Sequence, residues 1–256
     1  MIELDNVSRN YGRKVAVDRL TMRIAPGEIF AFLGPNGAGK TTTIKMMVGL
    51  LRPTSGSVRV GGHDMTTHAR EAASLLGYVS DEPCLYDKLS GREFLEFVAR
   101  IRGFDPGETA RRIARQTEDF QLGDFLDALI ETYSHGMQQR LTFAGALLHD
   151  PAVLVVDEPT VGLDPRSVRL LKDLLRRHAA AGATVFLSTH TLAVAEEIAE
   201  RIGIVHRGRL RFLATRDEVA DQLRSQQLSL EGMFLRITET VENGHGEPVG
   251  EDVPRD

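Results

Sequence analysis

One stretch of nine residues restricts what this chain can fold into more than any other feature. Residues 34–42 read Gly-Pro-Asn-Gly-Ala-Gly-Lys-Thr-Thr, after an apolar run at 29–33 typical of a strand and before an apolar, helix-like segment at 43–51. Glycines let successive backbone N–H groups turn toward one anion, and the N-terminus of the following helix adds its dipole. Gly-x-x-x-x-Gly-Lys-Thr in this setting therefore predicts a loop that binds phosphate groups.

The side chains of this loop predict a nucleoside triphosphate as the ligand. Lys40 can reach the β- and γ-phosphates, and the Thr41 hydroxyl can bind Mg²⁺. The candidate nucleotide-binding residues of the loop are Asn36, Gly37, Ala38, Gly39, Lys40, Thr41 and Thr42. Such a site also needs an aspartate for the metal and a group that acts on water.

Both groups follow a second apolar run, at 152–156, which is rich in valine as in a strand buried on both faces of a parallel sheet. Asp157 and Glu158 stand at the carboxyl end of that run, where ligands bind in such sheets. We expect Asp157 on the metal side and Glu158 to orient or deprotonate the attacking water. His190 follows another predicted strand, at 183–188, and should lie at the same edge; by itself, a histidine there is more often structural.

The whole chain limits the alternatives. Its 256 residues allow one α/β domain with an inserted subdomain or two small domains, and one cassette is simpler. A net charge of -5 makes nucleic acid an unexpected partner. With no signal-like start and no apolar run long enough for a membrane span, we expect a cytosolic protein, in which the single cysteine, Cys84, is a free thiol.

The remaining elements follow from local patterns. Ser90 and Glu93 predict a capping box at a helix start, and Phe94, Phe97, Val98 and Ile101 follow at helical spacing, as one buried face would require. Ser134 and Asp164 are predicted N-caps of two later helices. Further strands are predicted at 2–7, 20–24, 58–60, 75–79, 202–206 and 210–213, an all-helical region from about 90 to 149, and one or two helices from 216 to about 237.

Taken together, these motifs resemble the nucleotide-binding domain of ATP-binding cassette (ABC) transporters, over residues 2 to 215. The phosphate loop, residues 153–158, Gly162-Leu163-Asp164 and Ser188-Thr189-His190 occur in the family's order. The signature segment, Leu-Ser-Gly-Gly-Gln in most members, reads Tyr133-Ser134-His135-Gly136-Met137 here, followed by Gln138. This variant is similar to ATPase subunits of bacterial exporters of drugs, antibiotics or polysaccharides, whose permease is a separate polypeptide.

The resemblance implies an α/β fold, a P-loop NTPase of the ABC ATPase type. It has a mainly parallel RecA-like core, an N-terminal antiparallel β subdomain and an inserted α-helical subdomain. We therefore expect an ABC ATPase domain at 1–215 with the helical insertion at about 88–149, a helical extension at 216–240, and a disordered acidic tail at 241–256.

The resemblance also implies roles that the residues alone leave open. Tyr11 would stack on adenine, although a lone tyrosine in a loop is more often surface packing, and His190 would contact the γ-phosphate and the attacking water. Asp81 stands where the family has a glutamine that contacts Mg²⁺, and Glu82 is beside it, so either carboxylate could replace that glutamine. Cys84, Leu85 and Tyr86 either contact the permease or pack under the helical subdomain.

By the same resemblance, the protein hydrolyses ATP with Mg²⁺ and acts as a head-to-tail dimer, most economically a homodimer. Residues 134–138 and Asp164 would complete the partner's site, and the permease would hold the protein at the inner face of the membrane. Two other interpretations remain at this point: a mechanical switch acting on ribosomes or nucleic acid, and a regulatory subunit with little hydrolysis.

Overall fold

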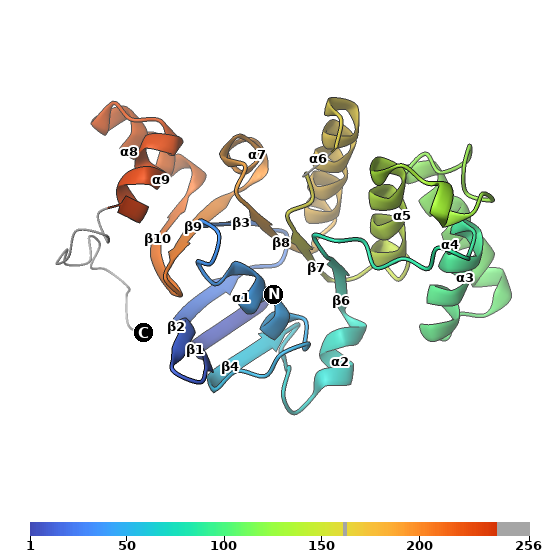
Figure 1. Cartoon of the computed structure of the whole chain (residues 1–256), viewed down its shortest axis with the longest axis horizontal. Coiled ribbons are helices and arrows are strands. Elements are labelled where there is room, and N and C mark those ends of the chain that lie inside the picture. The colour runs from blue at the N-terminus through green and yellow to red at the C-terminus, as the bar shows by residue number, and fades with distance from the viewer. Residues whose placement is uncertain (161–162, 240–256) are drawn as a thin grey trace.

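A six-stranded sheet forms the centre of the protein (Figure 1). The computed structural model describes residues 1–160 and 163–239. The strand order is β10-β9-β3-β8-β7-β6, and every pairing is parallel except that of β10 with β9. Its strands are β3 (Ile29–Leu33), β6 (Leu76–Val79), β7 (Val153–Asp157), β8 (Thr184–Thr189), β9 (Arg201–His206) and β10 (Arg209–Thr215). The predicted parallel core is confirmed, since all residues of β3, β7 and β8 are buried.

The N-terminal part of the chain forms a second, antiparallel sheet, also as predicted. Its order is β2-β1-β4-β5. The strands are β1 (Ile2–Tyr11), β2 (Lys14–Ile24), β4 (Ser55–Val60) and β5 (His63–Asp64). Apolar residues of this sheet share one core with Phe30, Phe32 and Phe186, whose ring centroids lie 5.3 to 6.4 Å apart. Burial of these aromatic rings holds the two sheets together.

The helices form groups at the two ends of the molecule and around the central sheet (Figure 1). One group, with α3, α4 and α5, lies at one end, and α8 and α9 lie at the other. The helices are α1 (Lys40–Met47), α2 (Ala69–Ser74), α3 (Gly91–Ile101), α4 (Pro106–Asp119), the 3-10 helix η1 (Ile130–Thr132), α5 (His135–Leu147), α6 (Pro165–Ala180), α7 (Leu192–Ile198), α8 (Arg216–Gln226) and α9 (Leu230–Glu239). The predicted tail at 241–256 lies outside the described residues.

The buried face of α3 differs from the prediction. Phe94 is buried, but Phe97 and Ile101 are 39% and 69% exposed. The helix turns Phe94 toward α5 because Gly145 there leaves room for the ring, and a β-carbon at Gly145 would lie 3.1 Å from it. The buried side therefore continues through Leu95 and Ala99.

Polar contacts of α6 connect it to its neighbours on both sides. Lys172 forms an ion pair with Glu197 of α7, whose backbone carbonyl also accepts a hydrogen bond from Arg176 at 3.0 Å. Arg177 lies 3.3 Å from Asp119 at the end of α4. Helix α6 thus links the helical group to the segment after β8. Within the described ranges, no helix is long and apolar enough to cross a membrane.

Candidate functional site

The carboxyl ends of three adjacent strands lie level with one another and bring the predicted site residues together. Leu33, the last residue of β3, is opposite Thr189 of β8, and Asp157 of β7 is opposite Ser188. The segments that follow, which begin at Gly34, Glu158 and His190, therefore share one edge of the sheet, where parallel α/β sheets bind their ligands.

The phosphate loop has the backbone conformation that its glycines allow. Gly39 precedes α1 with φ 109°, and a β-carbon there would lie 2.6 Å from the carbonyl oxygen of Ala16. Gly37 also has a positive φ, 78°. Asn36, Gly37 and Thr41 are exposed, whereas Ala38 is buried and Thr42 half-buried. The first turn of α1 thus presents backbone N–H groups and the Thr41 side chain where an anion could bind.

Lys40 is the buried cation of the site. It is 7% exposed, and its Nζ donates a hydrogen bond of 2.6 Å to the carbonyl oxygen of Gly34. The same Nζ lies 3.6 Å from Oε1 of Glu158. A buried ammonium needs such partners, because water does not solvate it there.

Glu158 is held between Lys40 and His190. Its backbone has φ 46°, an uncommon left-handed conformation for a residue with a side chain, and its N–H donates to the Ser188 carbonyl at 2.9 Å. Its Oε2 lies 2.8 Å from His190 Nδ1 and accepts a 3.2 Å hydrogen bond from the His190 backbone N–H. The two oxygens of this carboxylate are therefore directed toward the phosphate loop and toward the segment after β8.

Asp157 is the buried acid beside Glu158. Burial raises its pKa to about 6; the carboxylates of Asp81 and Glu158 add to this shift, and the charge of Lys40 opposes it. Among the described residues, neither oxygen of Asp157 has a hydrogen-bond partner. A buried carboxylate of this kind is suited to a cation.

The unpartnered carboxylate of Asp157 supports a site for a divalent metal ion. The described residues contain no cluster of three or more His, Cys, Asp or Glu side chains that would hold such an ion unaided. Mg²⁺ fits such a site, because it is commonly held by one or two protein oxygens together with substrate phosphates and water. Asp157 and the Thr41 hydroxyl could supply those oxygens. Asp81 is exposed, and its Oδ1 accepts a 3.0 Å hydrogen bond from the Glu82 N–H.

Tyr11 lies at the end of β1, and its side chain is open to solvent. The residue is 47% exposed, and the guanidinium of Arg9 stands 4.9 Å from the ring centroid. The opposite face of the ring could receive a flat ligand. Residue patterns did not indicate Arg9, and the spacing of two along a strand, which puts both side chains on one face, is the signal that could have done so.

The signature segment begins α5, which Figure 1 shows apart from α1. Ser134 is the N-cap, as predicted, and its Oγ accepts from the Met137 N–H at 3.4 Å. Ser134 and His135 are exposed, and Gly136, Met137 and Gln138 are half-buried. Asp164 caps α6 as predicted, accepting from the N–H groups of Arg166 and Ser167; Gly162 lies outside the described residues. One chain therefore does not bring its own signature segment to its phosphate loop.

Residues 84–86 are partly packed under the helical subdomain and partly exposed. Leu85 packs against the core that α3 and α5 share, whereas Cys84 and Tyr86 are exposed. The ring of Tyr86 meets Phe97 of α3 edge to face, with centroids 5.5 Å apart. These two rings form an exposed aromatic pair.

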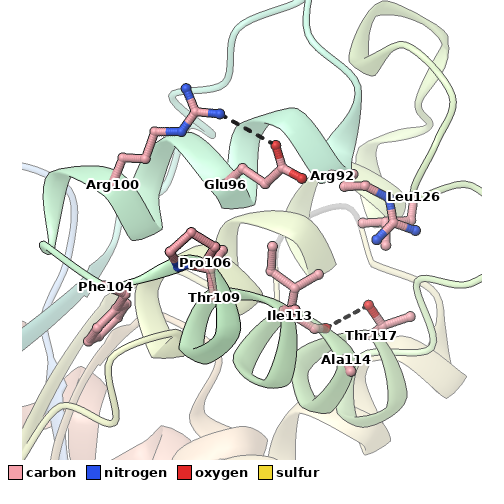
Figure 2. Close-up of a pocket in the computed structure, with 11 residues that line it drawn as sticks. Arg92, Glu96, Arg100, Phe104, Pro106, Thr109, Ile113, Ala114, Thr117 and Leu126 are labelled. Carbon is pink, nitrogen blue, oxygen red and sulfur yellow. Dashed lines mark hydrogen bonds and ion pairs between the residues drawn. The ribbon is translucent and has the colours of Figure 1, made fainter.

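A cavity of about 620 Å³ lies within the helical group (Figure 2). Charged residues of α3 line one side of it, and apolar residues of α4, with Phe104 and Leu126, line much of the rest. Ile113 of α4 points toward α3. An ion pair between Glu96 and Arg100 stands at its rim. Its lining comes from the helical group, so this cavity is separate from the carboxylates and the phosphate loop.

Comparison with known proteins supports the resemblance to ABC transporter ATPases. The chain matches the family model of the ABC transporter over residues 17–161. DrrA, the daunorubicin/doxorubicin resistance ATP-binding protein of Streptomyces peucetius, is 38% identical over 229 residues, which are 90% of this chain and 69% of DrrA. The Nod factor export ATP-binding protein I of Paraburkholderia xenovorans is 39% identical over 208 residues, 81% of this chain and 68% of that protein.

Solved structures agree. An ATP-binding subunit of an ABC transporter superposes with a TM-score of 0.86 at 30% identity, covering 93% of this chain and 99% of the other. The dimeric cassette MJ0796, described as a bacterial ABC transporter cassette, gives 0.75 at 27% identity, covering 84% and 99%. With the motifs in place and the relatives in agreement, this chain belongs to the ABC transporter family as an ATP-hydrolysing cassette.

Proposed function

We propose that this chain powers export through a separate membrane permease by hydrolysing ATP at the edge formed by β3, β7 and β8. The observation that carries the hydrolytic assignment is the position of Glu158, between Lys40 at 3.6 Å and His190 at 2.8 Å and next to Asp157. A carboxylate beside the phosphate-binding lysine is suited to act on water near the γ-phosphate.

The phosphate loop holds the substrate. Lys40 and the backbone N–H groups of residues 36–42 bind the β- and γ-phosphates, and Tyr11 stacks on adenine. Thr41 and Asp157 hold Mg²⁺, with Asp81 or its neighbour Glu82 as a further ligand, directly or through water. The bound Mg²⁺ supplies positive charge that neutralises the phosphate oxygens.

Hydrolysis then proceeds by in-line attack. Glu158 orients the water and accepts its proton as the water oxygen bonds to the γ-phosphorus, and the bond from that phosphorus to the ADP oxygen breaks. His190 holds Glu158 and contacts the γ-phosphate. The products are ADP and phosphate.

A second chain completes the site. Because the signature segment of one chain is remote from its own phosphate loop, residues 134–138 and Asp164 serve the site of a partner subunit, most economically a second copy. The similar cassette MJ0796 forms a dimer, which supports this arrangement.

The permease makes the protein peripheral at the inner face of the cell membrane. The aromatic pair of Tyr86 and Phe97 is our choice for the contact, because an exposed apolar cluster is suited to a protein interface. Export as the direction follows from relatives named for drug resistance and for Nod factor export.

Replacement of Glu158 tests the hydrolytic role. Glu158→Gln keeps the shape but cannot accept the proton, so ATP turnover should fall by about a hundredfold or more while ATP binding remains, with accumulation of an ATP-bound dimer. Phosphate release and size-exclusion chromatography measure the two effects. Glu71→Gln, at an exposed position of α2, is the control and should behave as the wild type. Normal turnover in Glu158→Gln would remove this residue from catalysis.

A further inference from the structure

Arg9 is fixed beneath the ring of Tyr11 by contacts with a distant segment. Its guanidinium lies 4.9 Å from the ring centroid, and an Nη1 hydrogen donates to the carbonyl oxygen of Arg52 at 2.9 Å. The strand itself is held to the same segment, because the Asn10 N–H donates to Thr54 Oγ1 at 3.1 Å and the Thr54 N–H to the Ser8 carbonyl at 2.7 Å. Arg9 therefore connects the end of β1 to the residues that follow α1.

This arrangement leaves the aromatic ring with two different faces. The cation occupies one face, where it is attracted by the ring quadrupole. The ring is still half-exposed, so a flat ligand can approach the other face. A ring held in place loses less conformational entropy when a base stacks on it than a freely rotating ring does.

We propose that Arg9 is a positioning residue for the nucleobase, holding Tyr11 as a platform with one open face. This inference rests on the proposed role of Tyr11 in stacking on adenine. The competing explanation is that Arg9 only secures the backbone near Arg52, in which case its loss would affect phosphate binding as much as base binding.

The chain contains no tryptophan, which makes the stacking step observable. Tyr11→Trp introduces a single indole emitter at the platform. ADP with Mg²⁺ should quench its emission, whereas pyrophosphate with Mg²⁺, which has no base, should bind with little change. Both ligands avoid turnover.

The decisive comparison removes the charge of Arg9. In the Tyr11→Trp background, Arg9→Met should weaken ADP binding by about two- to fivefold, the range expected for a cation over an exposed ring, and leave pyrophosphate affinity unchanged by calorimetry. Arg9→Lys keeps a cation and should recover most of the ADP affinity. Arg23→Met, at the opposite end of the same sheet where Arg23 pairs with Glu3, is the control and should match the parent.

Each other outcome has a distinct meaning. Equal loss of ADP and pyrophosphate affinity in Arg9→Met would show a backbone role and overturn the proposal, as would unchanged ADP affinity. If ADP leaves the indole emission unchanged and Tyr11→Ala binds ADP as the wild type does, the base site is elsewhere. In that case the assignment of Tyr11 fails first, and the role of Arg9 fails with it.

Discussion

At the residue scale, Asp157 makes folding stability depend on pH in the opposite sense to most acidic residues. Burial raises its folded-state pKa to about 6 from an ordinary value of 3.8. The folded protein therefore holds this proton more tightly than the unfolded chain does. The contribution of Asp157 to the free energy of unfolding is therefore largest at low pH. It decreases as pH rises from about 4 through 6, because the buried side chain becomes charged.

Asp157→Asn should reveal this cost. Without Mg²⁺ or nucleotide, the variant and the wild type should have similar free energies of unfolding near pH 4, and the variant should become more stable by about 1 to 3 kcal/mol at pH 8. Urea unfolding across this range measures the difference. Glu71→Gln removes an exposed carboxylate, and its free energy of unfolding should differ from that of the wild type by the same amount at every pH. If the difference between Asp157→Asn and the wild type does not change with pH, the assigned titration of Asp157 is wrong.

The gathering of the predicted site residues at one edge of the sheet could be foreseen from sequence, but one central contact could not. Motif spacing indicated Lys40, Asp157 and Glu158, because phosphate binding and water activation need those residue types. The ion pair between Lys40 and Glu158 depends on the order of the sheet, in which β8 lies between β3 and β7. Nothing in the local sequence of β3 or β7 determines which strand separates them.

At the scale of secondary-structure elements, two serine N-caps allow stability to be separated from function. Ser90 caps α3 through a capping box, and Ser134 caps α5. Replacing either serine with alanine should lower the free energy of unfolding by about 1 kcal/mol. Only Ser134→Ala should also reduce ATP turnover per folded molecule, because Ser134 is proposed to reach the partner's nucleotide. Equal turnover in both variants, measured at matched folded fraction, would argue against that role.

The same scale shows where sequence patterns were insufficient. The helical spacing of Phe97 and Ile101 predicted burial, but the fit of Phe94 against Gly145 decides which side of α3 faces inward. Strand β5 and helix α2 were not predicted, because they are short and carry little periodic apolar character. Their positions depend on contacts with β4 and β6.

At the scale of the whole molecule, separation of the signature segment from the phosphate loop predicts complementation between inactive subunits. Lys40→Ala should abolish nucleotide binding in its own chain, and Ser134→Ala should impair the site of its partner. A mixture of the two variants forms heterodimers with one intact composite site, so turnover should exceed that of either variant alone. Phosphate release at constant total protein measures it. If mixing restores nothing, one intact composite site does not suffice for turnover.

The aromatic pair gives a second prediction at this scale. Tyr86→Ser with Phe97→Ser should reduce co-purification with a multi-span membrane protein in detergent, because an apolar interface is lost, while ADP binding by the isolated chain stays unchanged. Leu235→Ser, which removes an exposed apolar side chain from α9 at the other end of the molecule, is the matched control. Mass spectrometry identifies the retained partner, and undiminished retention by the double variant would place the contact elsewhere.

The left-handed backbone of Glu158 has a consequence for how such a chain can change over generations. With φ 46°, this residue holds a conformation that costs a non-glycine residue of order 1 kcal/mol, and the buried charge of the neighbouring Asp157 adds to that cost. Glycine at 158 or asparagine at 157 would relieve the strain or the charge. Selection for thermal stability alone would therefore favour losing both acids, at the expense of the proposed turnover.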